Sequence, residues 1–182
     1  MEPIRAQVHA PPAHAERITT VVTLAGLRPT RAADLALLVT DRDDPGATDR
    51  WLVDSLPHLV VSLGPETVRV GPFVQPGLTA CVRCVAVGGS PATRGLAALL
   101  VPSGPLRAQD LDDALLVSAL GCAVRDLATW QHGGVPLTWS SSLTLSAHRP
   151  PELERWPRHP HCGCSWGPLD HRAAEQRRHL AG

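Results

Sequence analysis

The chain has 182 residues, 43% hydrophobic and 19% charged, proportions typical of one globular domain with a hydrophobic core. Its 17 acidic and 17 basic residues cancel, and no basic block interrupts the sequence, so we expect no nucleic-acid partner. The basic residues counted here are all arginine, which excludes chemistry that needs a lysine, such as a phosphate-loop lysine or a Schiff base.

The first two segments of the chain are interpreted as a tail followed by a strand. Residues 1–17 carry Pro3, Pro11 and Pro12 without a periodic pattern, which favours a flexible tail. The β-branched run 17–26 ("RITTVVTLAG") predicts a buried strand. Ordered structure is therefore expected to begin near residue 18.

A strand, a helix and a strand are predicted next. The apolar run 33–41 predicts a strand, and the turn-rich "DRDDPG" ends it. Pro45 opens a predicted helix over 45–56, and the apolar segment 57–64 predicts another strand. This order over about thirty residues predicts a β-α-β crossover in a parallel sheet.

The pattern then changes from a crossover to a meander. Residues 67–77 alternate until Pro72 and Pro76 interrupt them, which predicts an edge strand or a loop over the sheet. A surface loop is predicted over 88–109, which is rich in Gly, Pro and Ser.

The longest helix is predicted over 110–134, with Asp110 as its N-cap and Gly133 or Gly134 as its C-terminal stop. Its apolar stripe is Leu111, Leu115, Leu120, Val124 and Leu127. A strand is expected over 135–147, and 169–182 is interpreted as a polar helix or tail. One domain is thus expected over 18–168.

Four of the five cysteines form two close pairs. Cys81 and Cys84 lie two residues apart in "CVRC", and Cys162 and Cys164 flank a glycine in "HCGC". Each spacing lets two thiolates face one tetrahedral ion, so the four residues predict a closed structural zinc site. Such an ion would join the end of the chain to its middle.

Two other interpretations of the thiols are less favoured. A redox CxxC normally opens a helix after a strand, whereas "CVRC" follows a proline-rich loop; inert core thiols would not explain two pairs. Cys122 is predicted to pack in the core of the long helix. His159 and His161 flank the second pair and are expected to lie outside the ligand set.

No apolar stretch has the length of a signal peptide or a membrane span, so we expect a protein of the reducing cytoplasm with no membrane partner. In that compartment, paired cysteines more often bind metal than form disulfides.

The motifs "GPFVQPGLTACVRC" and "HPHCGCSW", together with "ADLALLVTDRDDPGATDRWLVDSL", resemble the second half of a ThiF/HesA-like, ubiquitin-activating-type domain. Within that superfamily they are similar to the branch found with thiazole/oxazole-modified peptides. The resemblance covers roughly 17–166 and implies a partial Rossmann-like mixed sheet of the α/β class, shortened at the N-terminus, with a four-cysteine zinc site.

The adenylating members of this family use a glycine-rich nucleotide loop and a lysine, and neither is found before residue 33. Asp41 and Arg50 lie where the family's metal-binding aspartate and helix arginine would fall, and Asp41 is interpreted as a turn or cap residue. We also expect that residues 1–17 do not form the leader-binding winged helix of other members, so that leader recognition would reside in another polypeptide or use a free edge of this sheet.

The resemblance implies a non-catalytic scaffold that assists a YcaO-type cyclodehydratase and its precursor peptide. The alternative is a shortened adenylating or sulfur-transfer enzyme of the same superfamily. We also expect a homodimer, with Trp51, Trp156 or Trp166 and the loop 88–105 as candidate interface anchors.

Overall fold

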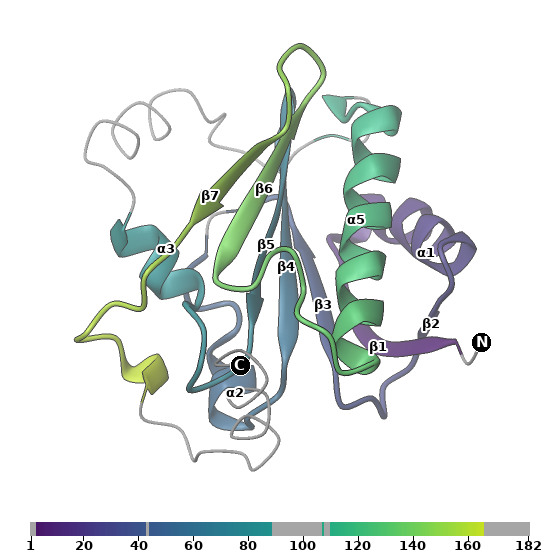
Figure 1. The fold of residues 1–182 in the computed structure, drawn as a ribbon. Coiled ribbons are helices and arrows are strands. Elements are labelled where there is room, and N and C mark those ends of the chain that lie inside the picture. The colour runs from purple at the N-terminus through teal and green to yellow at the C-terminus, as the bar shows by residue number, and fades with distance from the viewer. Residues whose placement is uncertain (1–2, 43, 89–106, 108–109, 166–182) are drawn as a thin grey trace.

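A seven-stranded mixed sheet with helices on both faces forms the frame of the molecule (Figure 1). It is seen in a computed structural model that describes residues 3–42, 44–88, 107 and 110–165. The elements of the first half are β1 (Ile4–His9), η1 (Pro12–His14), α1 (Ala15–Leu24), β2 (Leu27–Pro29), β3 (Ala36–Thr40), α2 (Asp49–Val53) and β4 (His58–Leu63). Those of the second half are β5 (Thr67–Val74), α3 (Val82–Gly88), α5 (Asp113–Gln131), β6 (Ser141–Ser146), β7 (Glu152–Arg155) and η3 (Gly163–Ser165).

The sheet has the strand order β2-β1-β3-β4-β5-β6-β7. The first four strands in this order pair in parallel, and the remaining pairs are antiparallel. Helix α2 lies in the connection from β3 to its parallel neighbour β4, so the predicted β-α-β crossover is confirmed. The change to a meander after β4 is also confirmed, and the fold is of the mixed α/β class.

The prediction of a flexible tail over residues 1–17 is wrong. Residues Ile4–His9 form β1, which lies inside the sheet between β2 and β3. Ile4 and Ala6 are buried and Arg5 is exposed, an alternation typical of a strand. Only after this strand do Pro11 and Pro12 interrupt the pattern, and the short helix η1 begins at Pro12.

The strand predicted over 17–26 is a helix, α1. Its buried residues, Ile18 and Val22, are four positions apart and face the core from one side of the helix. Thr20 donates its hydroxyl hydrogen bond to the carbonyl of Glu16, one turn earlier. Tertiary packing on one face thus outweighs the preference of β-branched residues for strands.

Strand β5 is not at an edge, because β4 and β6 pair with its two sides. A register shift in the β4 and β5 ladder leaves Gly71 and Pro72 opposite Val60. At a φ of 104°, Gly71 leaves no room for a side chain: a Cβ would lie 2.3 Å from the Ser141 carbonyl oxygen. The bulge allows a proline within an interior strand.

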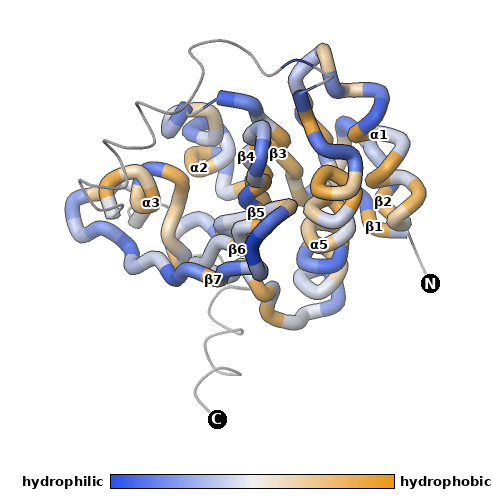
Figure 2. Tube along the Cα trace, turned by 90° about the horizontal axis from the view of Figure 1, so that it is seen from above, coloured by the Kyte–Doolittle hydropathy of each residue, from blue (hydrophilic) through white to orange (hydrophobic). Residues whose placement is uncertain are grey.

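Helix α5 covers one face of the sheet together with α1 (Figure 2). All five residues of its predicted apolar stripe are buried in the main core, which the sheet and these two helices enclose. Its N-cap is Asp112 rather than Asp110, and the Asp112 carboxylate accepts a hydrogen bond from the backbone N–H of Leu115 at 2.9 Å. The helix is shorter at both ends than predicted.

The opposite face of the sheet carries α2 and α3 (Figure 2). Here a second, smaller apolar cluster contains three of the cysteines together with Val74, Ala80, Val85 and Trp156. None of the helices in the described part of the chain is both long and apolar enough to cross a membrane. The predictions for 169–182, and for most of 88–109, fall outside the described residues.

Candidate metal centre

The first cysteine pair lies at the start of α3, just after β5. A tight turn connects β5 to α3. In this turn the backbone N–H of Gln75 donates to the Thr79 hydroxyl, and the backbone N–H of Thr79 donates to the Gln75 carbonyl. The Ala80 N–H then bonds to the Ser140 hydroxyl at 3.0 Å, which anchors the turn to the start of β6. Cys81 precedes the helix and Cys84 lies in its first turn, so both thiols point to one side. The motif therefore opens a helix after a strand, and the sequence-based prediction that it does not is wrong.

The second pair comes from the C-terminal part of the described chain, after β7. The backbone N–H of Cys162 bonds to the His159 carbonyl at 3.0 Å, which closes a turn before the short helix η3. A Cβ added to Gly163 would meet nothing within 4 Å, so open space surrounds the bend between the two cysteines. This turn presents Cys162 and Cys164 to the first pair.

The four sulfur atoms all lie within 4.8 Å of one another. The Sγ–Sγ distances are 3.8 Å for Cys81–Cys84, 3.5 Å for Cys81–Cys162 and 3.5 Å for Cys84–Cys164. These lengths are too great for disulfides, and all four cysteines are free. A tetrahedral ion with metal–sulfur bonds of about 2.3 Å needs sulfur–sulfur edges of about 3.8 Å. The cluster therefore fits a four-thiolate metal ion.

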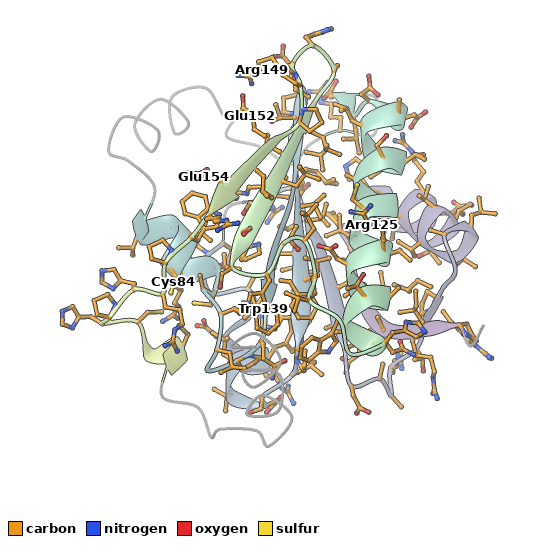
Figure 3. The ribbon with its side chains drawn as sticks, in the orientation of Figure 1. Cys84, Arg125, Trp139, Arg149, Glu152 and Glu154 are labelled. Atoms are coloured by element: carbon orange, nitrogen blue, oxygen red, sulfur yellow. The ribbon has the colours of Figure 1, made fainter. Side chains whose placement is uncertain are left out.

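Backbone bonds to one glycine hold the two cysteine pairs against each other. The N–H of Gly77 donates to the Cys164 carbonyl at 3.1 Å, and the Gly77 carbonyl accepts from the Arg158 guanidinium at 2.7 Å. Neither Gly77 nor Arg158 was identified as part of the site from the sequence; the only signal was the location of each beside a cysteine motif. Figure 3 shows Cys84 among these segments, where α3 faces the C-terminal turn.

Trp156 closes the centre from the side of β7. Its ring is buried, packs in the cysteine cluster and donates its indole N–H to the Ser142 hydroxyl at 2.8 Å. It is therefore not the exposed interface anchor that the sequence suggested. Trp166, another of the suggested anchors, lies outside the described residues.

Burial has different consequences for the pKa of each thiol. Burial raises the pKa of Cys164 to about 11 and that of Cys81 well above its usual value. Burial acts in the same direction at Cys84, but hydrogen bonds outweigh it and lower the pKa; the backbone N–H of His159 donates to this sulfur at 3.3 Å. A bound cation would supply the positive charge that thiolates at the other buried positions require.

The two histidines that flank the second cysteine pair lie beside the four-sulfur cluster. The rings of His159 and His161 contact each other, with centroids 5.8 Å apart, and the group of clustered ligand atoms in the described residues contains neither. His159 acts on the cluster through its backbone N–H. Cys122 is half-buried on α5 and packs against the main core.

Asp41 and Arg50, the two residues that matched adenylating members of the family, make no ion pair with each other in the described structure. Asp41 directly follows β3, and its side chain is 8% exposed. Arg50 points outward from α2: its side chain is 91% exposed and pairs with Asp54, one turn along, at 3.5 Å. Trp51 instead lies between the rings of His9 and His58, with centroid separations of 5.1 and 5.2 Å.

Solved structures of the same fold include a heterocyclase and a microcin C7 biosynthetic enzyme. The chain superposes on the heterocyclase TruD with a TM-score of 0.67 and 18% identity, covering 90% of this chain and 28% of that one. A heterocyclase in complex with substrate and cofactor gives a TM-score of 0.67 and 19% identity, covering 90% of this chain and 26% of that one. Escherichia coli MccB in complex with MccA gives a TM-score of 0.57 and 15% identity over 76% of this chain and 41% of that one.

These similarities establish the fold and no more, because every identity is below 20%. The chain spans about a quarter of the length of the two heterocyclases. No protein-family model and no curated protein matches the sequence. The related fold nevertheless agrees with the mixed sheet of the α/β class that the resemblance implied.

Proposed function

We propose that the chain is a zinc-stabilised, non-catalytic partner protein in the biosynthesis of thiazole/oxazole-modified peptides. The observation that carries the proposal is the fold shared with the heterocyclase TruD over 90% of the chain, with the four cysteines gathered in one cluster. The neighbouring MccB structure contains the peptide MccA, which supports a peptide as a partner here. The branch of the ThiF/HesA-like superfamily that the motifs resemble is the one found with thiazole/oxazole-modified peptides.

In this proposal the metal is zinc, and Cys81, Cys84, Cys162 and Cys164 are its ligands. Four thiolates with no position left for water are typical of structural zinc. The ion would join α3 to the turn after β7, two segments separated by about eighty residues, and so shape the surface beside the sheet. Its contribution would be to folding rather than to a reaction.

The ring-forming chemistry would belong to a YcaO-type cyclodehydratase that acts with this chain in the cytoplasm. Two features support that division of labour. The 182 residues include no lysine that could hold a phosphate, and the connection from β1 to α1, residues 10–14, contains no glycine. The proposed task of this chain is to bring enzyme and peptide together.

Co-expression with a YcaO-type protein and a precursor peptide rich in Cys, Ser and Thr tests the proposal. We expect co-purification of the chain with the cyclodehydratase, and mass spectrometry should show loss of one water per ring only when both proteins are present. A cyclodehydratase that does not co-purify with this chain, and that forms as many rings without it, would refute the role.

A shortened adenylating enzyme is the second candidate, because the chain shares its fold with the microcin C7 biosynthetic enzyme MccB and places Asp41 at the end of β3. Calorimetry with ATP and magnesium distinguishes the two. Binding that disappears in Asp41→Asn would favour the enzyme, whereas the partner role predicts no measurable binding.

A further inference from the structure

Among the described residues, strand β7 pairs on one side only, and a single hydrogen bond shows which of its backbone groups point to the unpaired side. The N–H of Trp156 donates to the Ser140 carbonyl at 2.8 Å, so these two residues form a hydrogen-bonded pair of the β6 and β7 ladder. Such pairs alternate along an antiparallel ladder. Glu152 and Glu154 therefore point their N–H and C=O groups toward β6, whereas Leu153 and Arg155 point theirs outward.

No other strand of the described chain pairs with that outer side, because β7 ends the strand order. All four β7 residues are exposed, and Leu153 retains 46% of its surface. At the opposite edge, β2 is only three residues long and ends in Pro29, which has no N–H to offer. Strand β7 is thus the better template for an added strand.

The side chains of β7 are sorted by charge between the two faces of the sheet. Glu152 and Glu154 lie on the same face as Trp156, since alternate residues of a strand share a face. Their cross-strand neighbours on β6 are Thr144 and Ser142, which are uncharged, and neither glutamate makes an ion pair within the described residues. Figure 3 shows both glutamates along β7.

A second copy of the chain fits this edge poorly. In a sheet made of two copies of β7 related by a two-fold axis, side chains directly opposite each other lie on the same face. The residue numbers of two opposing residues must therefore differ by an even number. A pairing centred on Leu153 sets Glu152 opposite Glu154 of the other copy, and one centred on Glu154 sets that residue opposite itself. Like charges directly opposite each other are destabilising.

We propose that β7 binds an extended peptide segment with basic residues at alternate positions, as an added antiparallel strand. Read from its N-terminus, the segment would place an acidic residue opposite Arg155, a basic one opposite Glu154, an apolar one opposite Leu153 and a basic one opposite Glu152. The outward backbone groups of Leu153 and Arg155 would form its hydrogen bonds. This inference rests on the proposed function and names the docking strand and chemistry of its peptide partner.

Binding of three synthetic peptides to the full chain tests the pattern. The first carries Asp, Lys, Val and Lys in the stated order, the second has each charge inverted, and the third scrambles the first. Opposed charges along β7 distinguish the first peptide from the second, so we expect the second to bind about tenfold more weakly. The scrambled peptide should also bind more weakly, because its charges no longer alternate along the strand. Its net charge equals that of the first peptide, so the comparison isolates the alternation. Equal affinities for all three would overturn the inference.

Charge reversal on β7 provides the matched test. The double variant Glu152→Lys with Glu154→Lys should exchange the preference, binding the inverted peptide better than the original. Its control, Glu16→Lys with Glu66→Lys, changes the net charge equally at exposed sites outside β7 and should keep the original preference. A preference that both double variants alter alike would show nonspecific attraction and refute a site on β7.

Amide exchange followed by NMR identifies the groups involved without any substitution. The first peptide should slow exchange at Leu153 and Arg155, and leave Glu152 and Glu154 unchanged because β6 already protects them. Protection elsewhere with none at Leu153 would refute the docking strand. These peptide tests do not involve the cyclodehydratase, so their failure is distinguishable from a failure to co-purify with it.

Discussion

Each cysteine of the cluster experiences a different environment, although all four sulfurs lie within 4.8 Å of one another. Cys81, Cys84 and Cys164 are buried, and Cys162 is half-buried. A buried thiolate without a cation is unfavourable, so the loss of one ligand affects the charge balance of the other three. The half-buried position is the one where substitution disturbs packing least.

Replacing Cys162 with Ala should therefore reduce bound zinc to well below about half an equivalent per chain, because a structural zinc ion requires four ligands. Elemental analysis of the purified variant measures this. Cys122→Ala is the matched control, since that thiol packs on α5 outside the cluster and should leave the zinc content unchanged. Equal zinc content in the two variants would contradict the assignment of the ligands.

His58 is the residue whose titration should affect stability most clearly. Its ring is buried against Trp51, and burial lowers its pKa from 6.5 to about 4. The ring Nδ1 contacts the Leu56 carbonyl at 2.8 Å, so the neutral form donates this hydrogen bond from Nδ1. Between pH 6.5 and about pH 4, the unfolded chain therefore binds a proton at this histidine more readily than the folded chain does.

Stability from this residue is complete above pH 6.5 and decreases as the pH falls toward about 4, by about 3 kcal/mol in total. Urea unfolding at several pH values, compared with His58→Gln, isolates the effect. The glutamine retains an N–H donor but does not titrate, so the stability of the native protein relative to this variant should fall between neutral and low pH. A constant difference across this range would show that His58 does not titrate as described.

At the scale of elements, the connection from α5 to β6 depends on one buried carboxylate. Asp126 accepts hydrogen bonds from the Leu137 and Thr138 N–H groups at 3.1 and 2.9 Å, and from the Thr138 hydroxyl at 2.7 Å. The Thr138 carbonyl in turn accepts from the Phe73 N–H of β5 at 2.9 Å. Asp126 thus links the helix to the middle of the sheet.

Asp126→Ala should destabilise the fold by about 3 kcal/mol, because it leaves three donors without their acceptor. Asp112→Ala is the comparison, since it removes only the N-cap of the same helix and should cost about 1 kcal/mol. Urea unfolding gives both values. Similar losses in the two variants would mean that water replaces the buried acceptor.

The whole molecule has two apolar clusters within its described residues, and only the smaller one contains the paired cysteines. The larger cluster lies between the sheet and helices α1 and α5, and it needs no ion. Removing the metal should therefore loosen one side of the molecule before the other. Strand β5 contributes to both clusters, because its adjacent residues Phe73 and Val74 belong to the larger and the smaller cluster respectively.

Treatment with a chelator should accelerate hydrogen exchange first in 81–88 and 159–165, while 115–127 stays protected. Hydrogen exchange followed by mass spectrometry measures this, and restored protection on adding zinc is the control. Uniform acceleration along the chain would mean that the metal supports the entire fold.

The homodimer expected from the sequence also belongs to this scale, and it stays a prediction. Light scattering of the purified chain should give twice the monomer mass. We expect the dimer interface to lie outside β7. A dimer that dissociates in Leu153→Pro, a change that removes an outward N–H of the edge strand, would place the interface on β7 after all.

The sequence by itself determined the features that depend on local spacing. It identified the four cysteines, because the two members of each pair are separated by only one or two residues. A local turn is enough to bring such a pair of ligands to one ion. It also identified β3, β4 and the long helix α5, whose apolar patterns have the period of the structure that they form.

Only the tertiary structure decided where those elements lie and which side chains they bury. Residues Ile4–His9 form an interior strand because β2 and β3 pair with its two sides. The β-branched run after it forms a helix because Ile18 and Val22 pack on the core from one face of α1. The outward groups of β7 depend on its pairing with β6 in the same way. Burial and pairing depend on contacts between residues distant in the chain, which local propensity does not encode.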